Sequence, residues 1–270
     1  SISLDQSFVM TREGFRGTLT LNNGHETEAI KEFELNLEIK NRDGELCNDL
    51  FQIETETLNQ LTGIDGSGSL SANESGTATL LFIPEKEAAP TTTTSYSFGG
   101  NISYLDPFTN TIVTKQLFPV ILEVHPSPDL HLHYFLQTNI LGDDPLTPEF
   151  EPVIPAELAL MIENNGYGQA SNVQVNSAQP KIIDSEKGLD IEFLLVGSNL
   201  QGQAHNLGLT DIEFGNIPAL TAITGQWWFT SSILGHIISY NATLTHLNSR
   251  GNPELSLISD ISTHELVKSM

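Results

Sequence analysis

Apolar and polar residues alternate with a period of two through much of the first half of the chain. The alternation is clearest at Thr18–Leu21, Phe33–Lys40 and Thr77–Ile83. Every second side chain of such a segment lies on one face, so these segments are predicted to be half-buried β-strands. Turn signals, among them Gly63–Gly68 and Gly99–Gly100, recur about every 8–12 residues without a helical period between them, which is typical of an all-β sandwich.

The first sandwich is predicted to end with a strand at Thr111–Val124, in which Pro119 marks a sheet edge or a bulge. His125–Pro128 follows, and two prolines in four residues predict a short, stiff, extended linker. We therefore expect one domain at residues 1–126 and a second at residues 127–270.

Strand signals resume after the linker, and a polar, proline-rich loop is predicted at Gly142–Pro155. The strands of the second half are predicted at Asp129–Leu136, Ala156–Glu163, Asn172–Asn176, Leu189–Val196, Ile212–Phe214, Thr221–Phe229, Ile237–His246 and Leu255–Ile261. The predicted fold class is all-β, with two tandem immunoglobulin-like antiparallel β-sandwiches.

Net charge removes some classes of partner. The 270 residues carry 11 Lys and Arg against 34 Asp and Glu, a net charge of −23. The surplus is spread evenly, at −11 over residues 1–126 and −12 over residues 127–270. This sign disfavours nucleic acid and anionic membranes as partners. The single cysteine, Cys47, rules out a disulfide framework within the chain, and we expect a mature protein or a piece of a longer one.

The segment Ala156–Val175 carries a family resemblance. It reads as a strand, then Asn165-Gly166, then a small residue followed by an Asn-Val-x-Val pattern that ends at Val175. We expect Asn165-Gly166 to supply the positive φ of the turn, and Val173 and Val175 to face the core. The pattern resembles bacterial cell-adhesion-related (CARDB-type) immunoglobulin-like domains over about residues 129–247, with a departure in a long insertion at Gln179–Gly208. The resemblance implies a non-catalytic module of a secreted or cell-surface protein, in tandem with neighbouring domains.

Histidines form one candidate metal site. His131 and His133 are two residues apart in a predicted strand, so they lie on the same face and would chelate a transition metal together, with Asp129 beside them. The alternative is that they are polar surface residues opposite an apolar face.

Carboxylates form two further candidate sites. Asp143 and Asp144, with Glu149 and Glu151, offer oxygen ligands for a structural calcium ion, as does the segment Asp65–Gly68. Neither follows the twelve-residue calcium loop, and a solvated loop is the alternative for both. No other cofactor is predicted.

The two tryptophans are adjacent, at Trp227 and Trp228, and side chains of adjacent strand residues point in opposite directions. One is therefore expected in the core. The other, with Tyr240, is a candidate contact for a partner or a sugar ring, unless a loop or a neighbouring domain covers it.

The sequence has no Gly-x-Ser-x-Gly turn, glycine-rich phosphate loop or His-Glu-x-x-His motif. With the all-β pattern, this favours a non-enzymatic role as a spacer or protein-interaction domain of an exported bacterial cell-surface protein. A carbohydrate-binding or enzyme-accessory module is the alternative. The expected partners are a protein or a glycan at the cell surface. Their identity and the oligomeric state are left open.

Overall fold

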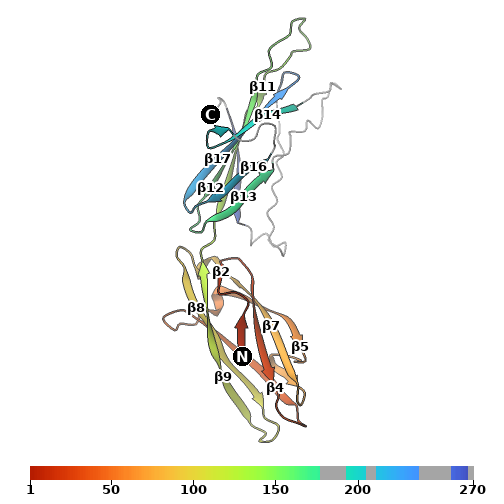
Figure 1. Ribbon diagram of the computed structural model, residues 1–270, viewed down its shortest axis with the longest axis vertical. Coiled ribbons are helices and arrows are strands. Elements are labelled where there is room, and N and C mark those ends of the chain that lie inside the picture. The colour runs from red at the N-terminus through yellow and green to blue at the C-terminus, as the bar shows by residue number, and fades with distance from the viewer. Residues whose placement is uncertain (177–192, 205–210, 237–256, 267–270) are drawn as a thin grey trace. The chain divides into compact units, whose positions relative to one another are not determined.

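The computed structural model describes residues 1–176, 193–204, 211–236 and 257–266 (Figure 1). The chain divides into an N-terminal unit, Ser1–Ser127, and a C-terminal unit, Pro128–Met270. Nearly all of the described secondary structure is β-strand, and two 3-10 helices of three residues each are the only helices in those ranges. Neither is long enough to cross a membrane. The predicted all-β fold class, with two β-sandwich units along the chain, is confirmed, and the sheets are antiparallel except at two parallel strand pairings.

The N-terminal unit packs a four-stranded sheet against a five-stranded sheet. The order of the first is β1-β3-β7-β5 and of the second β2-β9-β8-β4-β6. Their elements are β1 (Ile2–Leu4), β2 (Phe8–Met10), β3 (Phe15–Asn22), β4 (Ile30–Lys40), η1 (Asn48–Leu50), β5 (Phe51–Asn59), β6 (Asp65–Leu70), β7 (Ser75–Pro84), η2 (Lys86–Ala88), β8 (Thr94–Leu105) and β9 (Ile112–His125).

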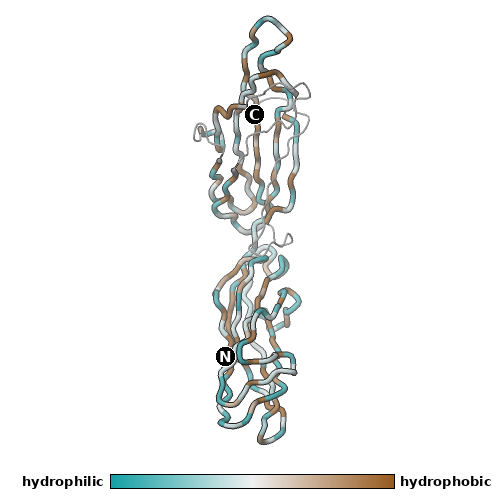
Figure 2. Tube along the Cα trace, turned by 90° about the vertical axis from the view of Figure 1, so that its right-hand side faces the viewer, coloured by the Kyte–Doolittle hydropathy of each residue, from teal (hydrophilic) through white to brown (hydrophobic). Residues whose placement is uncertain are grey.

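The core of this unit lies between the two sheets, where the apolar positions of the alternating segments meet. Figure 2 shows hydrophobic and hydrophilic positions following one another along the trace of this unit. Phe82 of β7 is fully buried, stacks on Phe15 of β3 at 5.2 Å between ring centroids, and meets the edge of Phe98 of β8 at the same distance. The strands predicted from alternation are therefore confirmed, because burial of one face orders them.

One predicted breaker of the N-terminal unit is right in part, and a second is wrong. The segment Gly63–Gly68 begins in the loop between β5 and β6, and its residues from Asp65 onward belong to the edge strand β6. Gly99–Gly100 lies inside β8, where the pairing with β9 shifts register, so that Phe98 faces Val120 and Gly100 faces Leu117. Gly100 has φ +109, and a Cβ there would lie 2.0 Å from the Asn36 carbonyl oxygen. The extra residue of the bulge therefore lies on β9, where Phe118 and Pro119 stand opposite Gly99, and the glycines allow the close approach of Asn36 without ending β8.

The C-terminal unit is built on a six-stranded sheet of order β15-β14-β17-β12-β10-β19. The pair β13–β16 covers the core face of this sheet, and β11–β18 forms a small separate pair. The strands are β10 (Leu130–Leu136), β11 (Asn139–Ile140), β12 (Ala156–Asn164), β13 (Ala170–Asn176), β14 (Phe193–Leu200), β15 (Gln203–Ala204), β16 (Asp211–Ile217), β17 (Thr221–Ser231), β18 (Gly235–His236) and β19 (Ile258–Glu265). The proline-rich loop is confirmed between β11 and β12, and the predicted strand Ile237–His246 and most of the insertion Gln179–Gly208 lie outside the described residues.

The turn after β12 is held by a side chain, and the predicted positive φ at Asn165-Gly166 is wrong, because neither residue has one. The amide nitrogen of Asn164, whose side chain is buried, donates to the carbonyl oxygens of Gly168 (2.8 Å), Ile217 (3.2 Å) and Pro218 (3.1 Å). Its amide oxygen accepts from two backbone N–H groups, at 3.0 and 3.1 Å. The Asn164 side chain thus links the loop after β12 to the end of β16 and to the segment before β10.

Asn23 of the N-terminal unit makes the same kind of cluster. Its amide nitrogen donates to the carbonyl oxygens of Glu28, Leu70 and Ser71, and its amide oxygen accepts from the backbone N–H of His25. Both units therefore use a buried asparagine to satisfy backbone groups that no strand pairs.

Candidate functional sites

The outer face of the six-stranded sheet carries the predicted histidines. Along β10, the leucines and Tyr134 point into the core, while His131 and His133 point outward, as their spacing requires. Their surroundings differ, however. His131 Nε2 lies 3.7 Å from Asp129 Oδ1, and His133 Nε2 lies 3.6 Å from Glu163 Oε2 of the neighbouring strand β12. Each imidazole therefore faces its own carboxylate.

The second imidazole beside His133 is His264, which comes from β19 and which sequence reasoning did not include. The His133 Nδ1 and His264 Nε2 atoms are 3.4 Å apart. The hydroxyl oxygen of Ser262 lies between them, 2.7 Å from His133 Nδ1 and 3.1 Å from His264 Nε2. The ring of Phe135 also stacks on His264, with 4.9 Å between ring centroids. The contact arises because β19 pairs with β10 in parallel, placing Ser262 opposite His133.

The tryptophan pair divides between the two faces of β17. Trp227 is 1% exposed in the core, whereas Trp228 is partly exposed on the outer face. Trp228 lies opposite Glu157, a buried carboxylate that accepts a hydrogen bond of 2.7 Å from Gln226 Nε2. Tyr240, the third predicted contact residue, lies outside the described residues.

The predicted calcium loop satisfies its carboxylates with its own donors. The two oxygens of Glu151 accept from the backbone N–H of Asp144 at 2.9 Å and from Thr147 Oγ1 at 2.8 Å. These bonds hold the pKa of Glu151 below its ordinary value. Asp143 Oδ1 accepts from the backbone N–H of Glu151, and Asp144 Oδ1 from that of Leu146. These hydrogen bonds engage the carboxylates of the loop, and calcium binding there stays a prediction.

Asp65 in β6 behaves in the same way. Its Oδ1 accepts from the hydroxyl of Ser67 at 2.6 Å and from the backbone N–H of Ser67 at 3.1 Å, and these bonds lower the pKa of Asp65. Across the described ranges, no three or more His, Cys, Asp or Glu side chains cluster closely enough to hold a metal ion together.

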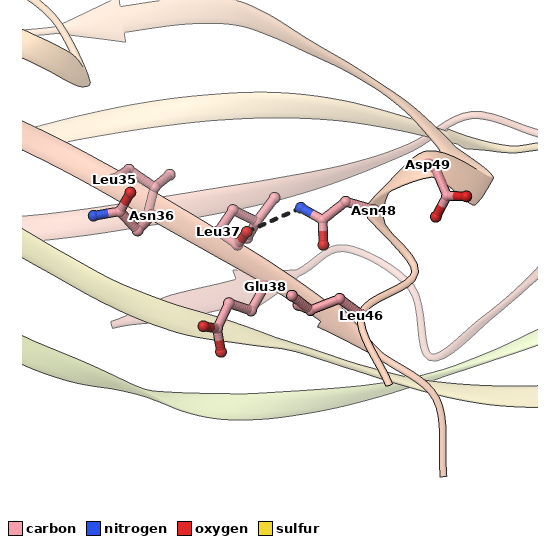
Figure 3. Close-up of a pocket in the computed structure, with 7 residues that line it drawn as sticks. All are labelled: Leu35, Asn36, Leu37, Glu38, Leu46, Asn48 and Asp49. Atoms are coloured by element: carbon pink, nitrogen blue, oxygen red, sulfur yellow. Dashed lines mark hydrogen bonds between the residues drawn. The ribbon is translucent and has the colours of Figure 1, made fainter. Parts of the chain in front are cut away.

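A hollow of about 620 Å³ opens beside β4 and η1 in the N-terminal unit (Figure 3). Asn48 fixes its rim, because its amide nitrogen donates to the Leu37 carbonyl oxygen and its amide oxygen accepts from the backbone N–H of Ile39, both at 2.9 Å. Two acidic residues, Glu38 and Asp49, line the hollow. Glu38 forms an ion pair with Lys40, with 2.6 Å between Glu38 Oε2 and Lys40 Nζ. The hollow is lined by Leu35, Asn36, Leu37, Glu38, Leu46, Asn48 and Asp49.

The edge strand β9 is a further candidate contact surface. Its partner on the outer side, β2, pairs only with Glu123–His125. In the described sheet, the stretch of β9 before that pairing is hydrogen-bonded to β8 alone, while β1 of the four-stranded sheet lies near β9 without pairing with it. Phe118 and Ile121 in this stretch are 90% and 59% exposed. The bulge at Pro119 is the reason that two apolar residues three positions apart both point outward.

No protein-family model matches the sequence, and no curated protein matches it. The CARDB-type resemblance therefore stays a prediction. Among solved structures, the chain is similar to the type II cohesin dyad from the adaptor ScaA scaffoldin of Acetivibrio cellulolyticus. That match has 13% identity and a TM-score of 0.25, over 99% of this chain and 98% of the other. The full-length major pilin SpaD from Corynebacterium diphtheriae matches at 9% identity and a TM-score of 0.32, over 97% of this chain and 64% of the pilin. The YadV chaperone matches at 10% identity and a TM-score of 0.25, over 93% of this chain and 95% of the chaperone. At these identities and TM-scores, the similarities carry no inference about function.

Proposed function

We propose that the chain is a non-catalytic structural or adhesive module of an exported bacterial cell-surface protein, which acts outside the cell as a protein-interaction domain or as a spacer between neighbouring domains. The observation that supports the interaction role is the open stretch of β9 with its two exposed apolar side chains. The acidic surface supports a protein or glycan partner over nucleic acid or an anionic membrane.

The β9 edge suits the addition of a strand from a partner. An unpaired strand edge offers a row of backbone N–H and C=O groups that form hydrogen bonds with an added strand. Pockets or apolar neighbours then bind every second side chain of the added strand and provide specificity. Charged residues and prolines usually block such an edge. Here Pro119 removes one N–H group, but the apolar side chains of Phe118 and Ile121 remain exposed on the outer face. The partner expected at this edge is an extended, apolar segment of another protein.

The experiment is an array of purified extracellular proteins and glycans, probed with the labelled chain. We expect binding to protein spots that falls at least tenfold in a Phe118→Lys/Ile121→Lys variant. Thr114→Lys is the matched control, because it adds a lysine at an exposed position of the same strand. Protein binding that survives in the double variant would reject the β9 edge as the contact surface, and an array without protein hits would leave the spacer role.

A carbohydrate-binding role is the competing function, and it rests on the partly exposed ring of Trp228, because its neighbours Glu157 and Gln226 are buried and hydrogen-bonded to each other. A tryptophan ring stacks on the apolar face of a sugar. The same array tests this role, because it predicts glycan hits that disappear in Trp228→Ala and persist in the Phe118→Lys/Ile121→Lys variant.

A further inference from the structure

We propose that His133 and His264 form a two-histidine site for a divalent transition metal, with zinc as the reference ion, on the outer face of the C-terminal sheet. The site differs from the pairing suggested by the sequence, because the second imidazole comes from β19 instead of from His131 on the same strand.

The distance between the two nitrogens fits one shared ion. Zinc binds imidazole nitrogen at about 2.0–2.1 Å with tetrahedral angles, so two nitrogens on one ion lie about 3.3–3.4 Å apart. His133 Nδ1 and His264 Nε2 are 3.4 Å apart. Little movement of either ring is therefore needed to bring both nitrogens into the zinc coordination sphere.

The neighbours of His133 leave the correct nitrogen available. Glu163 Oε2 lies 3.6 Å from His133 Nε2, so the carboxylate favours the tautomer that carries its proton on Nε2 and its lone pair on Nδ1. A carboxylate behind the non-ligating nitrogen is the usual support of a metal-binding histidine. His264 is held by Phe135, whose ring stacks on it at 4.9 Å. Both imidazoles are thus oriented before an ion arrives.

Oxygen donors complete the coordination. The Ser262 hydroxyl oxygen is 2.7 and 3.1 Å from the two nitrogens, so it can approach the ion directly or hold a water that does. Two imidazoles with oxygen ligands suit zinc, copper and nickel better than calcium or magnesium. The net charge of −23 attracts cations to the chain as a whole, and Glu163 lies beside His133 at the site itself.

A bound ion would join two segments that are 131 positions apart, at the parallel pairing of β10 with the edge strand β19. The chain holds one cysteine, so a metal ion provides a cross-link that no disulfide within the chain can provide. Zinc should therefore stabilise the C-terminal unit selectively.

The experiment is a calorimetric titration of the metal-free full chain with zinc chloride. We expect about one equivalent of zinc to bind with an affinity that falls at least tenfold in His133→Gln and in His264→Gln. The matched control is His131→Gln on the same strand and face, which should bind zinc as the wild type does. Glu163→Gln should weaken binding about tenfold through its effect on His133.

Nitrogen-15 NMR of the histidine rings identifies the ligating atoms, with shifts expected at His133 Nδ1 and His264 Nε2. Tryptophan fluorescence monitors folding of each variant, because both tryptophans lie in the C-terminal unit. The chain has eight histidines, so adventitious binding is subtracted with the His133→Gln/His264→Gln double variant. Equal zinc binding by the wild type and a folded double variant would overturn the proposal. A loss in His131→Gln as large as that in His133→Gln would also overturn it, in favour of the pair on β10.

Discussion

The buried amide of Asn164 makes the sharpest test of how the C-terminal unit is held together. Replacement by alanine removes the donors to the Gly168, Ile217 and Pro218 carbonyl oxygens and the acceptor of two backbone N–H groups. The two amide hydrogens are shared among three carbonyls, so the side chain contributes about four hydrogen bonds at about 1 kcal/mol each. We therefore expect Asn164→Ala to lower the free energy of unfolding of this unit by about 4 kcal/mol.

The assay is urea unfolding followed by tryptophan fluorescence, which reports on the C-terminal unit because both tryptophans lie there. With a slope of about 2 kcal/mol per molar urea, the loss corresponds to a midpoint about 2 M lower. Asn165→Ala is the control, because Asn165 is exposed and has a negative φ. We expect that control to change stability by less than about 0.5 kcal/mol.

The outcome separates two explanations of the Asn-Asn-Gly turn. If the turn depended on a backbone conformation that favours Asn165-Gly166, Asn165→Ala would be the more damaging substitution. If the turn depends on the buried amide, Asn164→Ala would be the more damaging substitution. Equal effects, or an Asn164→Ala loss below about 1 kcal/mol, would refute the hydrogen-bond argument, since the orphaned carbonyls would then be rehydrated without cost.

Three further predictions concern the N-terminal unit, with circular dichroism as the measurement. Burial raises the pKa of Tyr96 from 10.0 to about 12. Because the unfolded chain loses this proton near pH 10 and the folded chain keeps it, the free energy of unfolding should fall by about 1.4 kcal/mol per pH unit between pH 10 and 12, and Tyr96→Phe should flatten the slope. Gly100→Ala should cost at least about 3 kcal/mol, because it adds a backbone clash to a positive φ, while Gly44→Ala, with φ +83 and open space, should cost about 1 kcal/mol. Equal losses of stability in Gly100→Ala and Gly44→Ala would show that the clash is not the cause of the loss in Gly100→Ala. Phe82→Ala should cost about 3–5 kcal/mol through the cavity it leaves, and a loss below about 1 kcal/mol would mean that the ring cluster repacks.

Local patterns predicted the strands and the faces of their side chains. The alternation in Phe33–Lys40 and Thr77–Ile83 places β4 and β7, and the adjacent tryptophans divide between core and outer face as the pleat requires. These features depend only on neighbours in the chain, because the period of two follows from strand geometry. The glycine pair at Gly99–Gly100 shows the limit of such patterns. Glycine is typical both of a turn and of a strand position that another backbone approaches closely, and only the pairing with β4 and β9 distinguishes the two.

The candidate sites depend on contacts between distant segments, which a single sequence does not reveal. His133 was identified from its spacing to His131, yet the imidazole beside it is His264, 131 positions away. The same holds for Asn164, whose acceptors include two carbonyls from the end of β16. No local signal separates Asn164 from Asn165, because both precede the same glycine.

The parallel pairings explain why side-chain contacts gather at the sheet edges. In each unit, one strand joins the edge of an otherwise antiparallel sheet in parallel: β2 on β9, and β19 on β10. A parallel edge strand has no hairpin to set its register, so register must come from side chains. On β2, Phe8 meets the edge of the His125 ring at 5.9 Å, and on β19, Ser262 and His264 meet His133. In both units, a histidine of the strand to which the edge strand is added thus contacts that edge strand, and the residue it meets there decides the consequence. A phenyl ring leaves an apolar contact, whereas a second imidazole beside a hydroxyl creates a pair of nitrogen donors at the spacing a metal ion requires.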